Sequence, residues 1–220
     1  VHARYPIKKP MVVIGHSMGG CIARLLVTNT GDSLWREVFN KAPSETKMPP
    51  AHREVFEKSL VFNARPDIGR VIFIAAPLRG SGIAQSLLGR IGSMLVRSPG
   101  HLRDAGRYAF DLIQYHPDEL RLRRIPNSID TLAPNSRFVR AVNQIPMEPG
   151  VPLHVVAGDR GRGGNRDQTR AQMSDGVVPF WSSYVPEAVS EKIVPSNHSA
   201  HQHPETIAEV IRILNSNAKR

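Results

Sequence analysis

Residues 15–20 read Gly-His-Ser-Met-Gly-Gly and follow directly on the apolar run 11–14, Met-Val-Val-Ile. This order places Ser17 at a sharp turn from a strand into a helix, a nucleophile elbow, in which the hydroxyl is held clear of the backbone. The flanking Gly15 and Gly19 lack the Cβ atoms that would collide where strand and helix cross, and Ser17 must accept a strained backbone conformation. The chemistry that such a serine performs is acyl transfer.

The surrounding sequence separates this interpretation from a glycine-rich turn in which Ser17 only caps a helix. A β-branched strand pattern precedes the serine. Ile22, Leu25 and Leu26 then recur at helical spacing until Asn-Thr-Gly at 29–31 ends the pattern. Both flanks therefore favour the elbow.

A serine hydroxyl is a weak nucleophile at neutral pH, so it needs a histidine to take its proton and an acid to orient that histidine. Two residues follow Ser17 in the order expected for an elbow serine: Asp175, in the Ser-Asp-Gly-Val-Val-Pro segment at 174–179, and His198, which three residues separate from a predicted strand. Asp159, directly after another strand, is the second candidate for the acid, and Asp167 the third. Asp175 could also be an ordinary turn-forming residue.

The other histidines have different expected roles. His201 and His203 follow His198 closely, and we expect them beside the site or at the start of the next helix. The spacing His-x-x-His-x-His lacks the helical i, i+4 arrangement of a common zinc motif, so we predict no metal and no cofactor. His16 is expected to pack beside the serine and not to act as the base.

Strand and helix patterns alternate along the chain, which predicts an α/β fold with a mostly parallel sheet and helices on both faces. The predicted strands are 11–15, 70–75, 152–157 and 191–194. We expect the elbow to initiate the first helix and the others to cover 34–40, 52–62, 81–96, 102–114, 135–144 and 204–214. Active-site groups of such sheets collect at the carboxyl ends of the strands.

Two predicted helical segments carry further expectations. The segment 81–145 is long enough to form a helical cap over a pocket, within a single domain covering 1–220. The last helix is expected to bury a stripe formed by Ile207, Val210, Ile211 and Leu214.

With these residues in this order, the chain resembles the α/β-hydrolase superfamily, and in detail its bacterial lipase-like and esterase-like members. The resemblance rests on the elbow, on residues 71–81 with Pro-Leu-Arg-Gly-Ser at their end, and on Asp-Gly-Val-Val-Pro at 175–179. Leu78 stands where the family commonly has a histidine, so no role of that side chain is carried over.

The resemblance implies roles for four residues. Ser17 would be the nucleophile, Asp175 the acid and His198 the base, and the backbone N–H of Met18 would be one oxyanion donor. The family places several strands and a second donor before its elbow, whereas 16 residues precede Ser17 here. We therefore expect an N-terminally truncated chain that forms the second half of the fold, with 11–14 as an exposed apolar edge.

Composition limits the classes of partner. The chain of 220 residues carries a net charge of +10, with many arginines between Arg90 and Arg140, yet lacks the interleaved aromatics of a nucleic-acid stacking platform. We predict no nucleic-acid partner and no membrane-spanning segment, while peripheral contact with an anionic membrane surface stays open. The single cysteine, Cys21, is expected to be a buried side chain and fixes neither the compartment nor the oligomeric state.

The function that these observations predict is hydrolysis of carboxylic esters, in small molecules or lipids, through an acyl-enzyme intermediate. A peptidase or thioesterase could use the same three side chains. A non-catalytic fragment or binding module is the alternative from another class.

Overall fold

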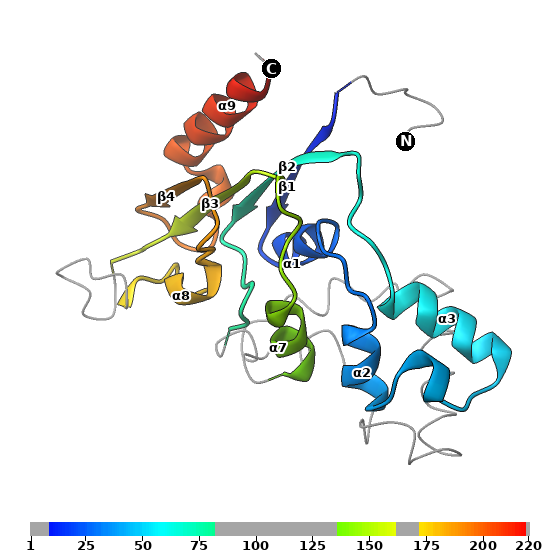
Figure 1. Cartoon of the computed structure of the whole chain (residues 1–220). Helices are drawn as coiled ribbons and strands as arrows, with labels where there is room; N and C mark the ends of the chain where they lie inside the picture. The colour runs from blue at the N-terminus through cyan, green and yellow to red at the C-terminus, as the bar shows by residue number, and fades with distance from the viewer. Residues whose placement is uncertain (1–8, 82–135, 162–171, 219–220) are drawn as a thin grey trace. The chain divides into compact units, whose positions relative to one another are not determined.

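The computed structural model describes residues 9–81, 136–161 and 172–218, and it contains a four-stranded sheet (Figure 1). The strands are β1 (Met11–His16), β2 (Ile68–Ile74), β3 (Leu153–Gly158) and β4 (Ser190–Val194). They lie in the order β1-β2-β3-β4, and every neighbouring pair is parallel. The predicted α/β class and parallel sheet are confirmed, with each strand within two residues of its predicted bounds.

Helices cover both faces of this sheet, as predicted. Alternate residues of β2 and β3 point to opposite faces because side chains alternate along a strand. One face packs against α1 (Met18–Leu25) and the turn after it, in a cluster that includes Ala23, Val27, Val71, Phe73 and Val155. The other face packs against α9 (Pro204–Ala218), in a cluster that includes Ile72, Ile74, Val156, Val194 and Ile213.

The remaining described elements are α2 (Ser33–Phe39), α3 (Pro50–Leu60), α7 (Arg137–Gln144), α8 (Phe180–Ser183) and two 3-10 turns, η1 (Pro43–Glu45) and η4 (Ala200–Gln202). The helices predicted at 34–40, 52–62, 135–144 and 204–214 are thus present with shifted ends. α3 begins earlier than predicted because Pro50 suits the first turn of a helix, where its missing N–H costs no hydrogen bond. The helices predicted at 81–96 and 102–114 lie outside the described residues.

The buried stripe predicted for α9 is right at Val210, which packs against the core, and wrong at Ile207, Ile211 and Leu214, which are exposed. Ile207 and Ile211 are 48% and 52% exposed, and it is Ile213, at 0%, that enters the core together with the half-buried Val210. The two stripes 207, 211, 214 and 206, 210, 213 have the same helical spacing, so periodicity by itself could not choose between them.

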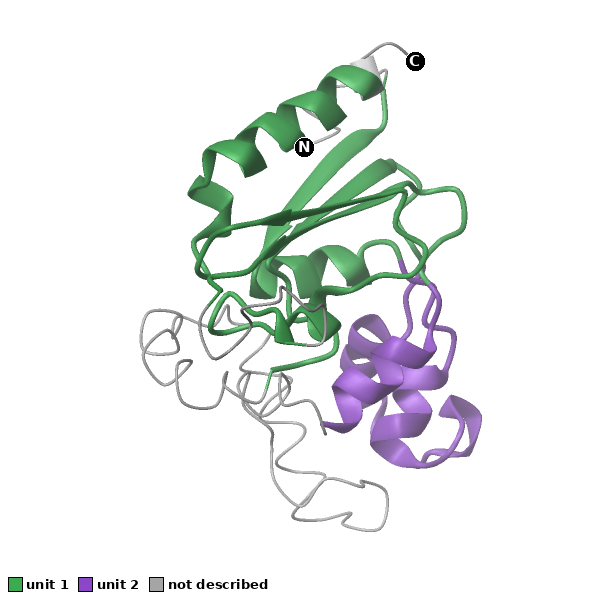
Figure 2. Cartoon of the chain, turned by 90° about the vertical axis from the view of Figure 1, so that its left-hand side faces the viewer, with its two compact units in different colours: residues 1–27, 64–81, 147–220 green, residues 28–63, 82–146 purple. Residues whose placement is uncertain are grey.

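The chain divides into two compact units (Figure 2). The first comprises 1–27, 64–81 and 147–220 and holds the sheet, α1, α8 and α9; the second comprises 28–63 and 82–146 and holds α2, α3 and α7. The second unit has its own aromatic core of Trp35, Phe39 and Phe56, in which the indole N–H of Trp35 donates to Thr46 Oγ1 at 3.0 Å. Most of the predicted cap at 81–145 lies outside the described residues and stays a prediction.

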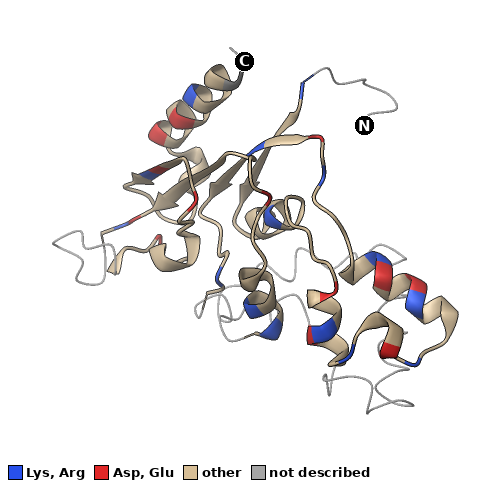
Figure 3. Cartoon of the chain, viewed as in Figure 1, with Lys and Arg blue, Asp and Glu red and all other residues tan. Residues whose placement is uncertain are grey.

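Charged residues of both signs lie on α2, α3 and α9, whereas α1 and α7 carry arginine alone (Figure 3). On α3, Lys58 pairs with Glu54, and on α9, Arg212 pairs with Glu209, in each case at 2.6 Å. Exposed pairs of this kind contribute little to stability.

Among the described helices, none has the length and apolar character needed to cross a membrane.

β1 lies at one edge of the described sheet, and the side chain of Ile14 is 46% exposed there. This agrees with the expected apolar edge at 11–14. An exposed strand edge of this kind offers unpaired backbone groups and an apolar side chain to a further strand.

A buried polar row crosses the sheet on the face that carries α9. Arg70 Nη1 donates to His154 Nε2 at 2.5 Å, and because a guanidinium only donates, His154 must be neutral with its proton on Nδ1. That N–H donates to Ser190 Oγ at 2.6 Å, and the serine hydroxyl lies 3.4 Å from a carboxylate oxygen of Glu209. Burial, with the neighbouring Arg70 charge, lowers the pKa of His154 from 6.5 to about 4.

This arrangement predicts a loss of stability in mild acid. The unfolded chain takes up a proton at His154 near pH 6.5, whereas the folded chain resists it until about pH 4. The free energy of unfolding should therefore fall by about 3 kcal/mol as the pH drops from 6.5 to 4, since one pKa unit corresponds to 1.36 kcal/mol. Urea unfolding of wild type and His154→Gln at pH 7 and pH 4.5 measures it: the variant should lose less stability on acidification, and equal losses would contradict the assignment.

Candidate active site

Ser17 occupies the turn between β1 and α1 with φ 54° and ψ −128°. Residues other than glycine rarely adopt positive φ, so this conformation stores strain. The surrounding sheet holds it: the N–H of Ser17 donates to Ile74 O at 3.0 Å, and its carbonyl accepts from Gly20 N at 2.9 Å. The serine is therefore fixed at the carboxyl end of β1, as the elbow prediction requires.

Two glycines permit this turn, but they are not the pair expected from the pentapeptide. A Cβ on Gly15 would lie 2.6 Å from the carbonyl oxygen of Gly19, and a Cβ on Gly20 would lie 2.3 Å from the Cβ of Ala76. A Cβ on Gly19 would meet no atom within 4 Å. The helix therefore crosses close to the strands at Gly15 and Gly20, and the expected steric role of Gly19 is wrong.

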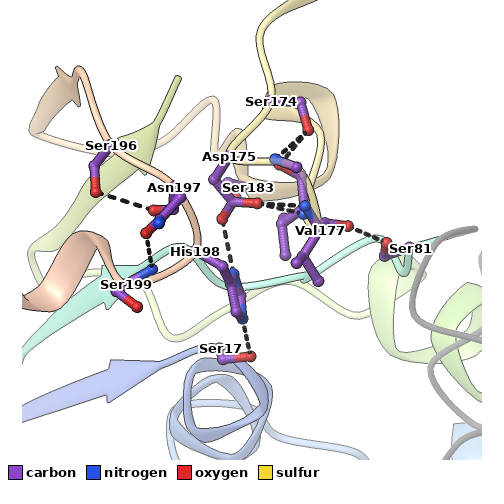
Figure 4. A network of polar contacts seen from close by, with 12 residues as sticks. Ser17, Ser81, Ser174, Asp175, Val177, Ser183, Ser196, Asn197, His198 and Ser199 are labelled. Atoms are coloured by element: carbon purple, nitrogen blue, oxygen red, sulfur yellow. Dashed lines mark hydrogen bonds and ion pairs between the residues drawn. The ribbon is translucent and has the colours of Figure 1, made fainter. Parts of the chain in front are cut away.

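The structure brings Ser17, His198 and Asp175 together (Figure 4). Ser17 Oγ lies 2.8 Å from His198 Nε2, and His198 Nδ1 lies 2.8 Å from Asp175 Oδ2. The residues come from the end of β1, from the loop after β4 and from the loop between β3 and α8. The imidazole therefore bridges a hydroxyl and a carboxylate.

The Asp175 carboxylate is held on both oxygens and is 2% exposed. Its Oδ1 accepts hydrogen bonds from the backbone N–H groups of Val177 and Val178, each at 2.7 Å, which leaves Oδ2 facing the imidazole. The loop is tight because Ser174 and Pro179 pair across it and Gly176 has a φ of 93°. These bonds satisfy a carboxylate that burial would otherwise destabilise.

Two further residues shape the acid loop, and sequence reasoning missed both. A Cβ on Gly158, at the end of β3, would lie 2.9 Å from both the Asp175 Cβ and the Ser196 carbonyl, so a glycine lets the acid and histidine loops meet there. Ser81 Oγ donates to the Val177 carbonyl. The sequence signal that could have identified Gly158 is a glycine at the end of a buried strand, before the loops that carry the candidate acid and the candidate histidine.

Asp159, the second candidate for the acid, bonds to backbone N–H groups of its own loop. Asp159 Oδ1 accepts from Gly161 N at 3.0 Å and from Ser174 N at 3.5 Å, so this carboxylate helps to fold the loop that precedes Asp175. Asp167 lies outside the described residues. Geometry therefore favours Asp175 over the second candidate.

His16, His201 and His203 make contacts of different kinds. His16 Nε2 donates to the His198 carbonyl at 2.8 Å, and its ring lies 5.1 Å from the His198 ring and 4.1 Å from the His201 ring. Burial lowers the pKa of His16 below its ordinary value. His203 Nδ1 accepts from Glu205 N at 3.3 Å, at the start of α9, as expected for a helix-entry residue.

Cys21 lies one turn after the elbow with its Sγ 3.5 Å from the Pro77 carbonyl. Burial raises the pKa of the thiol to about 12, so it is not a thiolate at neutral pH and cannot be a second nucleophile. Leu78, which stands where the resembled family has a histidine, is buried in the apolar cluster beneath α1.

The backbone N–H of Met18 is the expected oxyanion donor. Met18 is the first residue of α1, where backbone N–H groups lack a partner within the helix, so its N–H can serve a ligand as the prediction requires.

Within the described ranges, no group of three or more histidine, cysteine or acidic side chains is arranged to hold a metal ion.

No family model matches the chain, and no curated protein matches it. Similar solved structures include the mature lipase BlEst2 of Bacillus licheniformis, at 14% identity over 97% of this chain and 67% of that chain, with a TM-score of 0.47. The lipase of Staphylococcus hyicus matches at 13% identity over 96% of this chain and 70% of that chain, with a TM-score of 0.46. A metagenomic carboxyl esterase matches at 15% identity over 89% of this chain and 47% of that chain, with a TM-score of 0.43.

The glycine geometry predicts opposite outcomes for two matched substitutions. Gly15→Ala should lower the free energy of unfolding by about 1–3 kcal/mol, because its Cβ would strike backbone atoms that cannot move independently. Gly19→Ala should change it by less than about 1 kcal/mol, because the Cβ enters open space and alanine favours a helix. Denaturant unfolding of both variants tests the crossing, and an equal loss in both would refute it.

Proposed function

We propose that this protein is a serine hydrolase that cleaves carboxylic esters through an acyl-enzyme intermediate. The observation that carries the proposal is the continuous row of hydrogen bonds from Ser17 through His198 to Asp175, with both heavy-atom distances at 2.8 Å. The Ser17–His198 distance is within the range needed for proton transfer, and the His198–Asp175 distance is that of a hydrogen bond that orients the imidazole. No metal or cofactor takes part in the proposed reaction.

The bonding of Asp175 sets the tautomer of the proposed base. An ionised carboxylate only accepts hydrogen bonds, so His198 donates its Nδ1–H to Asp175 Oδ2. The lone pair of Nε2 then faces Ser17 Oγ, whose O–H donates to it. In this state the imidazole is ready to remove the serine proton, and the carboxylate stabilises the imidazolium that results.

The proposed reaction has two half-reactions. Ser17 Oγ attacks the ester carbonyl while its proton passes to His198 Nε2, and the tetrahedral intermediate then expels the alcohol, which takes that proton and leaves an acyl-serine. Water attacks the acyl-serine with His198 as base, and collapse releases the carboxylic acid and returns the proton to Ser17. The Met18 N–H is the proposed donor to the oxyanion, and loss of one such donor typically costs about 10²–10³ in rate.

The proposed substrate is a small-molecule ester or a lipid. The same three side chains could also cleave an amide or a thioester, because they act on the carbonyl and not on the leaving group. Esters are favoured by the resemblance of the elbow and acid segments to esterases, and the test below includes the other acyl donors.

The first test measures hydrolysis of p-nitrophenyl esters of increasing acyl length by this protein. Ser17→Ala should abolish acyl-enzyme formation and reduce kcat by about 10⁴ or more, and His198→Ala should do the same, because nucleophile and base act as one unit. Labelling of Ser17 by a fluorophosphonate, read by mass spectrometry, identifies the nucleophile independently.

Three outcomes would contradict the proposal. Equal turnover by wild type and Ser17→Ala would exclude Ser17 as the nucleophile. Turnover of aminoacyl amides or thioesters without turnover of esters would keep the mechanism but replace the substrate class. A wild-type protein that neither turns over an acyl donor nor labels at Ser17 would favour a non-catalytic module.

A second test separates the two acidic candidates. Asp175→Asn should reduce kcat by about 10³–10⁴, because an amide can stabilise the wrong imidazole tautomer and not the imidazolium. Asp159→Asn is the matched control, and we expect kcat within about tenfold of wild type because that carboxylate bonds to loop backbone. A larger loss in Asp159→Asn than in Asp175→Asn would reverse the assignment.

A further inference from the structure

The residue directly before the proposed nucleophile is bonded to the main chain of the proposed base. His16 ends β1, and its Nε2 lies 2.8 Å from the carbonyl oxygen of His198. Because a carbonyl only accepts, the imidazole of His16 must carry a proton on Nε2 and donate it. We infer that His16 is a positioning residue that sets the separation between Ser17 and His198; this inference rests on the proposed function.

The bond matters because it closes a short ring of contacts. Ser17 and His16 are covalent neighbours, and His198 is held by its Nε2 against Ser17 Oγ and by its carbonyl against His16, both at 2.8 Å. Fixing main chain and side chain at once leaves the imidazole little freedom to swing away from the hydroxyl. Precise placement of reacting groups is worth large factors in rate.

Two further hydrogen bonds in the loop that carries His198 join residues that are close in sequence. Ser199 N donates to Asn197 Oδ1 at 2.9 Å, and Ser196 Oγ donates to the Asn197 carbonyl at 3.1 Å, and both bonds are exposed (Figure 4). They shape the loop but do not attach it to the strand that carries Ser17. The His16 bond makes that attachment from β1, while Asp175 restrains the imidazole through its Nδ1.

The charge of His16 is also suited to this position. The titratable groups that face it are His198, His201 and Asp175. A cation at His16 would oppose the imidazolium that forms on His198 during the reaction, since the two rings are 5.1 Å apart. Burial lowers the pKa of His16, which keeps the ring neutral at neutral pH while its N–H still donates.

The test compares His16→Gln, His16→Leu and His16→Asn, with His201→Gln as the matched control. Glutamine can place an amide N–H where the imidazole Nε2 lies, whereas leucine has no donor and asparagine is too short to reach. His201 contacts the His16 ring only through its own ring. For each variant, KM and the maximal rate are measured on a p-nitrophenyl ester. The maximal rate is then divided by the number of sites that a fluorophosphonate labels at Ser17, which gives kcat per labelled site.

We expect kcat per labelled site to fall about tenfold to a hundredfold in His16→Leu and His16→Asn, with KM unchanged, because misplacement affects the reacting groups and not substrate binding. His16→Gln and His201→Gln should keep kcat per site within about threefold of wild type. A purely structural role would instead lower the number of labelled sites and leave kcat per site intact.

Three results would overturn the inference: wild-type kcat per site in both His16→Leu and His16→Asn, an equal loss in His16→Gln, or an equal loss in His201→Gln. Failure of the proposed function is separate. It would be seen as absent labelling of Ser17 in the wild-type protein, before any substitution at His16.

Discussion

The close crossing of α1 over the ends of β1 and β2 is the constraint on which the site depends. Gly15 and Gly20 have no Cβ, so the helix backbone can lie against the strand and against Ala76. The chain then has no room for a relaxed turn, and Ser17 takes a φ of 54° with its hydroxyl directed out of the sheet edge. Packing around the parallel sheet compensates for the strain, and the strained residue is the proposed nucleophile.

The three proposed catalytic side chains meet because the strands that precede their loops are parallel neighbours. The carboxyl ends of parallel strands share one edge of a sheet, so loops after β1, β3 and β4 come together there. Gly158 lets the last two loops approach closely, and backbone N–H groups hold Asp175 with one oxygen free for the imidazole. A buried carboxylate with fixed partners orients a histidine better than an exposed one, since it has no competing water contacts.

Burial shifts the pKa values of three side chains in the first unit, and the consequence differs between them. His154 and His16 both stay neutral because burial lowers their pKa values, one to connect strands and the other to hold the His198 loop. Burial also raises the pKa of Cys21, so the only thiol in the sequence is inert beside the elbow. The Cys21 thiol therefore does not compete with the proposed nucleophile, Ser17.

The sequence by itself determined the α/β class, the four described strands and the three residues that the structure brings together, because strand periodicity, glycine spacing and chain order are local signals. Only the tertiary structure decided which glycine the crossing needs, which stripe of α9 is buried, that Asp159 folds a loop, and that His16 reaches the His198 carbonyl. These outcomes depend on distances between segments far apart in the chain. The two stripes of α9 share the same helical spacing, and the order of residues along the chain does not contain the distances between segments, so no local pattern could have distinguished these outcomes.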